Sequence, residues 1–184
     1  PSDSFSADYG KLIASMLSAG FDIQAQRWAS LVEAEGSADD AWALLAVGAP
    51  SPVVSISASK VESYASGVGS DNAYKARLLI AALGGLGRLT PGELAQLGED
   101  YELSLNTQNR YTRILDRAAA RGEQGTVAVL AAAGMQTVAW KYVPPVYLYH
   151  IIAALKRTGN EPVARMIAAE AISRADIILP CSFP

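Results

Sequence analysis

The amino-acid sequence predicts an all-α fold of about nine or ten short antiparallel helices, paired as hairpins in a compact array or a short α-solenoid. Three observations support this prediction. A helix-ending pattern recurs four times along the chain. Residues that start helices follow these endings. Only one segment is a plausible strand, and two prolines make it a poor one.

The recurring pattern is an aliphatic residue, Ala, any residue, Leu or Met, three variable residues and Gly. The aliphatic residue and the Leu or Met are three positions apart and therefore share one helix face. Ala on that face allows a neighbouring helix to approach closely. Gly ends the helix because it adopts the left-handed conformation without steric cost. The copies span residues 13–20, 80–87, 127–134 and 152–159.

The residues that follow these glycines are typical of helix starts. Asp22 can cap a helix after the first copy, and Asn160 can do so after the last. Thr90 and Glu93 have the spacing of a capping box, with Pro91 at the first helical position. The repeated unit is therefore a helix, a glycine, a short turn and a second helix.

A pass along the whole chain extends this pattern to ten helices. Ser37 and Asp40 are a possible start signal for the third of them. Pro50 and Pro52 interrupt residues 49–57, which favours an extended crossover over a central strand. The helices are expected at residues 7–18, 22–34, 38–47, 58–67, 71–86, 91–98, 107–121, 124–133, 145–158 and 161–175.

The helix expected over 107–121 carries a row of arginines at spacings that place them on one face. Its apolar residues lie on another face, so the helix is amphipathic. Concentrated positive charge on an acidic chain could select carboxylates or phosphates, or could simply be solvated. The arginines are Arg110, Arg113, Arg117 and Arg121.

Pro144 and Pro145 predict the start of the helix over 145–158, because proline suits the first turn and disfavours helix before it. Aromatic residues gather around this start: Trp140, Tyr142, Tyr147 and Tyr149. These rings either fill the gap between helix pairs or form a docking groove for a partner.

The chain's only histidine, His150, lies opposite the apolar stripe of the same helix. No local nucleophile or orienting carboxylate accompanies it, so we assign it to partner binding and not to catalysis.

Two short segments resemble pieces of the lytic transglycosylase pattern, E-S-Y-A-S-G-V-G from Glu62 and G-M-Q-T from Gly134. The resemblance implies that Glu62 would be a general acid in an enzyme acting on cell-wall glycan. In that family the two pieces lie in close succession, whereas here about seventy residues separate them.

The blocks A-A-A-G-M-Q-T, V-P-P-V-Y-L-Y and R-M-I-A-A-E-A-I-S-R-A resemble the C-terminal ends of certain uncharacterised alphaproteobacterial proteins. This resemblance covers mainly residues 124–175. It implies a bacterial helical domain and transfers no site. More broadly, the chain resembles helix-pair solenoids, but it lacks the aromatic and proline positions of tetratricopeptide repeats.

Composition limits the function classes. The net charge of −3 argues against a general nucleic-acid binder. Cys181 is the single cysteine, which excludes an internal disulfide and a cysteine-based zinc site, and no cofactor motif is present. No run is apolar enough to insert into a membrane. The compartment stays open between bacterial cytoplasm and periplasm.

We expect one helical domain over 1–175 and an extended tail over 176–184. Because Pro1 is not an initiator methionine, we interpret the chain as a fragment or a processed product.

The sequence thus favours a non-enzymatic helical-repeat module of a larger bacterial protein, one that binds a protein or peptide and needs no cofactor. An acidic partner is favoured by the arginines. The alternatives are the glycan-acting enzyme and a structural spacer or dimerisation domain. The expected partner-binding residues are Trp140, Tyr142, Tyr147, Tyr149, His150, Arg113 and Arg117.

Overall fold

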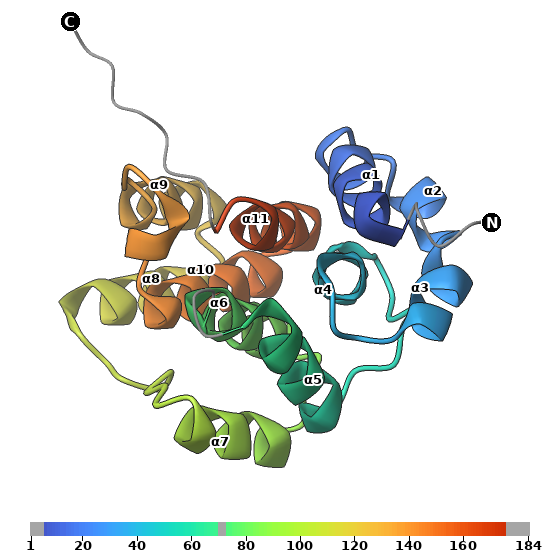
Figure 1. Cartoon of the computed structure of the whole chain (residues 1–184). Helices are drawn as coiled ribbons and strands as arrows, with labels where there is room; N and C mark the ends of the chain where they lie inside the picture. The colour runs from blue at the N-terminus through green and yellow to red at the C-terminus, as the bar shows by residue number, and fades with distance from the viewer. Residues whose placement is uncertain (1–5, 70–72, 176–184) are drawn as a thin grey trace, which may run out of the picture.

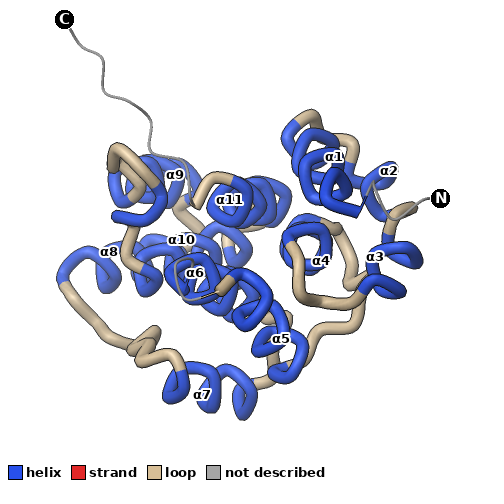
Figure 2. The backbone as a smooth tube through the Cα atoms, in the orientation of Figure 1, coloured by secondary structure: helices blue, strands red, loops and turns tan. Residues whose placement is uncertain are grey.

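The computed structural model describes residues 6–69 and 73–175, and over this part of the chain the fold is all-α, as predicted. It contains eleven α-helices, one short 3-10 helix and no strand (Figure 2). The tail expected over 176–184 lies outside the described residues. The α-helices are α1 (Ser6–Ser18), α2 (Asp22–Gln26), α3 (Ala29–Glu35), α4 (Asp40–Gly48), α5 (Ala58–Val68), α6 (Ala73–Gly85), α7 (Pro91–Asp100), α8 (Arg110–Ala120), α9 (Gln124–Gly134), α10 (Pro145–Arg157) and α11 (Glu161–Ser173), and the 3-10 helix is η3 (Trp140–Tyr142).

One expected helix is two. The segment 22–34 breaks between α2 and α3, where the amides of Arg27 and Trp28 bond to carbonyls only three residues back. This tighter turn accompanies packing of the Trp28 indole against the Tyr9 ring of α1, with the ring centroids 5.4 Å apart. No glycine or proline marks this break, so local sequence signals did not predict it.

The predicted glycine endings hold at three of the four copies. Gly20, Gly87 and Gly159 have φ of 76°, 64° and 82°, the left-handed region that ends a helix. The prediction is wrong at Gly134, which is the last residue of α9 and does not have a positive φ. A Cβ at Gly134 would lie 2.1 Å from the Tyr111 hydroxyl oxygen, so this glycine makes room for a ring of α8.

The capping box at α7 is confirmed, with the Glu93 amide donating to the Thr90 hydroxyl at 3.3 Å and the Thr90 amide donating to the Glu93 carboxylate at 3.0 Å. The start signal from Ser37 and Asp40 is wrong, because Asp39 caps α4. Asp40 instead accepts a hydrogen bond from the Tyr64 hydroxyl of α5 at 2.8 Å.

The two remaining predicted caps are also wrong. Neither α2 nor α11 has a side-chain cap hydrogen bond. Asp22 lies inside α2, and its carboxylate is 3.0 Å from the guanidinium of Arg165 on α11. A buried arginine from the far end of the chain therefore takes the carboxylate that the sequence assigned to the backbone.

Helices α4 and α6 form the centre of the molecule. Residues 41–48 of α4 are all buried, and α1, α3, α6 and α11 pack around them (Figure 1). Helix α6 contacts α5, α7, α10 and α11. Because α11 also packs on α1, helices from the two ends of the described chain meet. A solenoid repeat contacts only its neighbours, so the packing is that of a compact array.

Two arginines satisfy the carbonyl groups at the C-terminal end of α4. Arg88 donates to the carbonyls of Ala46 and Ala49, and the Arg165 Nε donates to the carbonyl of Gly48 at 3.0 Å. Burial, with a smaller contribution from Arg165, lowers the pKa of Arg88 to about 10. These bonds allow a helix end to lie inside the protein.

Two connections differ in their relation to the core. The segment 49–57 is an extended crossover, as predicted, and it receives a 3.1 Å hydrogen bond from the buried Trp42 indole to the Ser55 carbonyl. The segment 101–109 between α7 and α8 instead runs in a wide arc away from the centre (Figure 1). In the described part of the chain, no helix is long and apolar enough to cross a bilayer.

Candidate functional site

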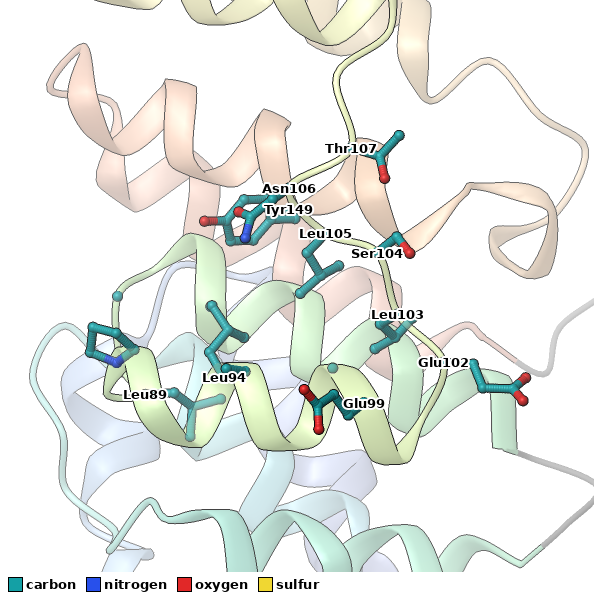
Figure 3. A pocket seen from close by; sticks show the side chains of 15 residues that line it. Leu89, Leu94, Glu99, Glu102, Leu103, Ser104, Leu105, Asn106, Thr107 and Tyr149 are labelled. Atoms are coloured by element: carbon teal, nitrogen blue, oxygen red, sulfur yellow. The ribbon is translucent and has the colours of Figure 1, made fainter.

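A hollow of about 970 Å³ lies between α7, the arc over 101–109, and the facing parts of α6 and α10. We call it the first hollow. Its apolar lining comes from different elements: Leu94 belongs to α7, Leu105 to the arc and Tyr149 to α10 (Figure 3). Leu89 and Leu103 extend the same lining. The cavity is thus apolar over much of its wall and is open to solvent.

The edge of the first hollow is acidic. Glu99 and Glu102 line it, and Figure 3 shows both at the same end of the cavity. The Glu102 carboxylate lies 3.8 Å from the Arg77 guanidinium and stays 88% exposed, so water weakens this pair. Glu99 has no ion-pair partner within the residues that the structure covers. The edge therefore carries negative charge that faces solvent.

The backbone at Glu102 is unusual. Its φ of 54° is the one positive value at a non-glycine residue in the described chain. The Leu103 amide bonds back to the Gly98 carbonyl at 2.7 Å, which ends α7 as a glycine normally would. A glutamate here costs conformational free energy that glycine would avoid. The conformation of this turn therefore does not favour a glutamate at position 102.

A second hollow, of about 550 Å³, adjoins the first, because Asn106 and Tyr149 line both. Helix α10 forms its floor with Ala153, and α8 contributes Asp116. The Asp116 Oδ1 lies 2.9 Å from Nδ1 of His150.

Cationic side chains, Lys156 and Arg157, lie at the end of the second hollow near the C-terminus of α10. Lys156 donates to the Leu86 carbonyl. Arg157 is exposed. The second hollow is therefore more polar than the first.

His150 is on the side of α10 opposite its apolar stripe, but this side is not exposed. Its side chain is 7% exposed and packs against α8, with Asp116 in reach of one ring nitrogen. The sequence offered no orienting carboxylate near His150, but the fold supplies one from 34 positions upstream. Helix α8 covers this side of α10 and brings Asp116 to the ring.

The other expected partner-binding residues do not gather in one surface. Trp140 lines a separate small cavity of about 150 Å³ with Arg174, and Tyr142 is 56% exposed beside Lys141. Tyr149 alone of the four aromatic residues lines the two hollows.

Tyr147 and Arg113 meet a common neighbour, Asn109. The Asn109 amide donates to the Tyr147 hydroxyl at 3.3 Å, and the Arg113 Nε donates to the Asn109 carbonyl at 3.2 Å. Tyr147 also stacks on Tyr111 at 4.6 Å between ring centroids. Arg117 is exposed on α8 and lines neither hollow. Tyr147 thus joins α8 to α10.

The two segments that resemble transglycosylases stay apart. Glu62 lies on α5, where its carboxylate accepts a 3.4 Å hydrogen bond from Gln96 of α7. The G-M-Q-T segment begins at the last residue of α9, a helix that Figure 1 shows well apart from α5. Glu62 lines neither hollow. Among the residues described, no three His, Cys, Asp or Glu side chains gather closely enough to hold a metal.

The sequence missed Leu94, Leu105, Glu99 and Asp116 as lining residues. Connection length does not single out this region, because the segment 49–57 is as long as the segment 101–109. Comparison of the chain with protein-family models, curated proteins and solved structures finds no match.

Proposed function

We propose that this chain is a binding module rather than an enzyme, and that the first hollow takes a short segment of a partner protein with apolar and basic side chains. The observation that supports this proposal is an open, leucine-lined cavity with solvent-facing carboxylates at one end. Its volume of about 970 Å³ is comparable with that of ligand clefts.

The lining favours a peptide over a small polar molecule. Leu94 and Leu103 are only partly buried, so an apolar side chain in the hollow would remove more of their surface from water. The side chains of Ser104, Asn106 and Thr107 make no hydrogen bond with the described residues and are free to bind a peptide backbone. Apolar anchors surrounded by polar groups are typical of peptide sites.

The charge at the edge favours a basic segment. Glu99 and Glu102 lie at the cavity, whereas Arg113 and Arg117, which had suggested an acidic partner, line neither hollow. A lysine or arginine beside the leucine-lined wall would pair with these carboxylates and speed association. We therefore replace the acidic partner by a basic one.

The test is a selection of displayed random peptides on the purified chain, followed by fluorescence anisotropy of the recovered sequences. We expect enrichment of leucine-like residues next to lysine or arginine. Leu94→Gln should weaken the recovered peptides about tenfold because it removes apolar contact. Leu31→Gln, which changes an exposed leucine of α3 outside the hollow, is the matched control and should have no effect.

The contribution of the acidic edge to peptide binding is tested with a second pair of variants. Glu99→Gln should weaken basic peptides by several-fold, and added salt should abolish this difference. Glu35→Gln, at an exposed glutamate of α3, should leave binding unchanged. Peptides that bind Leu94→Gln and Glu99→Gln as tightly as the natural chain would contradict the proposal. A chain that selects no peptide but dimerises in sedimentation would favour the spacer alternative.

A further inference from the structure

The chain's only histidine is held in one orientation. Nδ1 of His150 is 2.9 Å from Oδ1 of Asp116, and the Gln108 amide donates to the other Asp116 oxygen at 2.9 Å. An ionised carboxylate only accepts hydrogen bonds, so Nδ1 carries the hydrogen. In the neutral ring the lone pair is then on Nε2.

Nε2 of His150 has no partner. The atom is buried and makes no hydrogen bond within the described chain, and the whole side chain is only 7% exposed. A buried acceptor without a donor costs folding free energy, and such atoms are rare. The ring also lines the second hollow. Nε2 itself has almost no accessible surface, so a bound group reaches it only when the side chains that cover it move aside. A hydrogen bond donated to Nε2 would then remove this cost.

The charges of the second hollow indicate what else that group carries. Among the described residues that line it, the cationic side chains are Lys156 and Arg157 and the one acidic side chain is Asp116. Asp116 is already occupied by His150 and Gln108. Lys156 donates to a backbone carbonyl, while Arg157 has no ion-pair partner in the part of the chain that the structure covers.

The spacing on α10 brings Arg157 and His150 to one ligand. They are seven residues apart, which is about two helical turns and nearly the same face. Both side chains lean toward the N-terminus of the helix, and the longer arginine side chain covers part of the separation between them. The lining residues between them are Ala153 and Ala154, which leave the space open.

We infer that the second hollow binds a small oxyanion that still carries a proton, of which hydrogenphosphate is the simplest example. Its O–H donates to Nε2 of His150, and its other oxygens accept from the Arg157 guanidinium. The free amide groups of Asn106 add a further donor at the rim. This site is independent of the peptide proposed for the first hollow, and either can fail alone.

Because the chain has one histidine, nitrogen-detected NMR of the imidazole reports on this site without assignment ambiguity. We expect inorganic phosphate to shift the Nε2 resonance in a saturable manner. Sulfate has a similar shape but no O–H at neutral pH. It should therefore need a concentration at least about tenfold higher to cause the same shift of the Nε2 resonance. Phosphoserine in parallel distinguishes a free phosphate from a phosphate monoester as the source.

Arg157→Gln is the decisive variant, because Arg157 is exposed and its loss leaves the fold intact. This change should weaken the binding of inorganic phosphate about tenfold. Arg110→Gln makes the same charge change on the exposed face of α8 and should leave the titration unchanged. An Nε2 resonance that does not move at high phosphate, that responds equally to sulfate, or that shifts as before in Arg157→Gln would overturn the inference.

Discussion

The two ends of α4 and the two hollows beneath the α7–α8 arc use polar groups in opposite ways. Around α4, Asp39 caps the first turn and Arg88 and Arg165 bond the last carbonyls. In the second hollow, Nε2 of His150 has no partner, and the exposed Arg157 is unpaired within the described residues. The polar groups at the ends of α4 are thus satisfied inside the protein, whereas these two groups at the second hollow are not.

The largest expected effect tests the α4 side of this comparison. Arg165→Met should lower the free energy of unfolding by about 3 kcal/mol, because the Gly48 carbonyl and Asp22 lose their buried donor. Urea denaturation followed by circular dichroism measures it. Arg174→Met, which removes an exposed pair with Glu170, should change it by less than about 0.5 kcal/mol. Equal effects of the two changes on the free energy of unfolding would show that the buried Arg165 stabilises the protein no more than an exposed arginine does.

The next effect tests the contact between α6 and α10 that separates the core from the hollows. In Gly85→Ala the new Cβ would lie 2.8 Å from the Tyr149 carbonyl oxygen and 2.9 Å from Cβ of Ile152. We expect a loss of about 2 kcal/mol in thermal or urea unfolding. Gly92→Ala meets no atom within 4 Å and should stabilise α7 by up to about 1 kcal/mol. The same sign for both would show that the helices are not close-packed there.

A smaller effect separates stability from function at the first hollow. Glu102→Gly should raise the free energy of unfolding by up to about 1 kcal/mol, because glycine accepts the φ of 54° without strain. The same change should weaken basic peptides in the anisotropy assay. Gly87→Ala, at a φ of 64°, should instead destabilise the chain by about 1 kcal/mol. If Glu102→Gly destabilised the chain, the glutamate would serve the fold.

The smallest effect concerns pH at the start of α7. Hydrogen bonds from the Thr90 side chain, and then from the Thr90 and Ala58 amides, hold the pKa of Glu93 below its ordinary value of 4.5. Its contribution to stability is therefore complete above pH 4.5 and is lost as the pH falls through the lower folded pKa.

Thermal unfolding measured across this acid range should show that loss in the natural chain. The curve should be flatter in Glu93→Gln and unchanged in Glu35→Gln. If the Glu93→Gln chain kept the natural pH dependence, the capping box at the start of α7 would not be the source of the loss of stability in acid.

The positions of the helices follow from the sequence because their signals are local. A glycine ending acts through a residue and the turn before it, and the capping box through Thr90 and Glu93. Two of the failures share one cause. The sequence assigned Asp22 to a helix cap and Asp40 to the start signal with Ser37. In the structure their carboxylates pair with Arg165, 143 residues from Asp22, and with Lys75, 35 residues from Asp40.

By itself, then, the sequence determined an all-α chain and, apart from the break between α2 and α3, placed the helix boundaries to within three residues. It could do so because backbone conformation is set within a few neighbouring residues. Tertiary structure decided which side chains face one another: that α8 covers His150 and presents Asp116 to it, and that the arc before α8 leaves two hollows. Those outcomes depend on how helices far apart in the chain bury their apolar faces together, which no local pattern encodes.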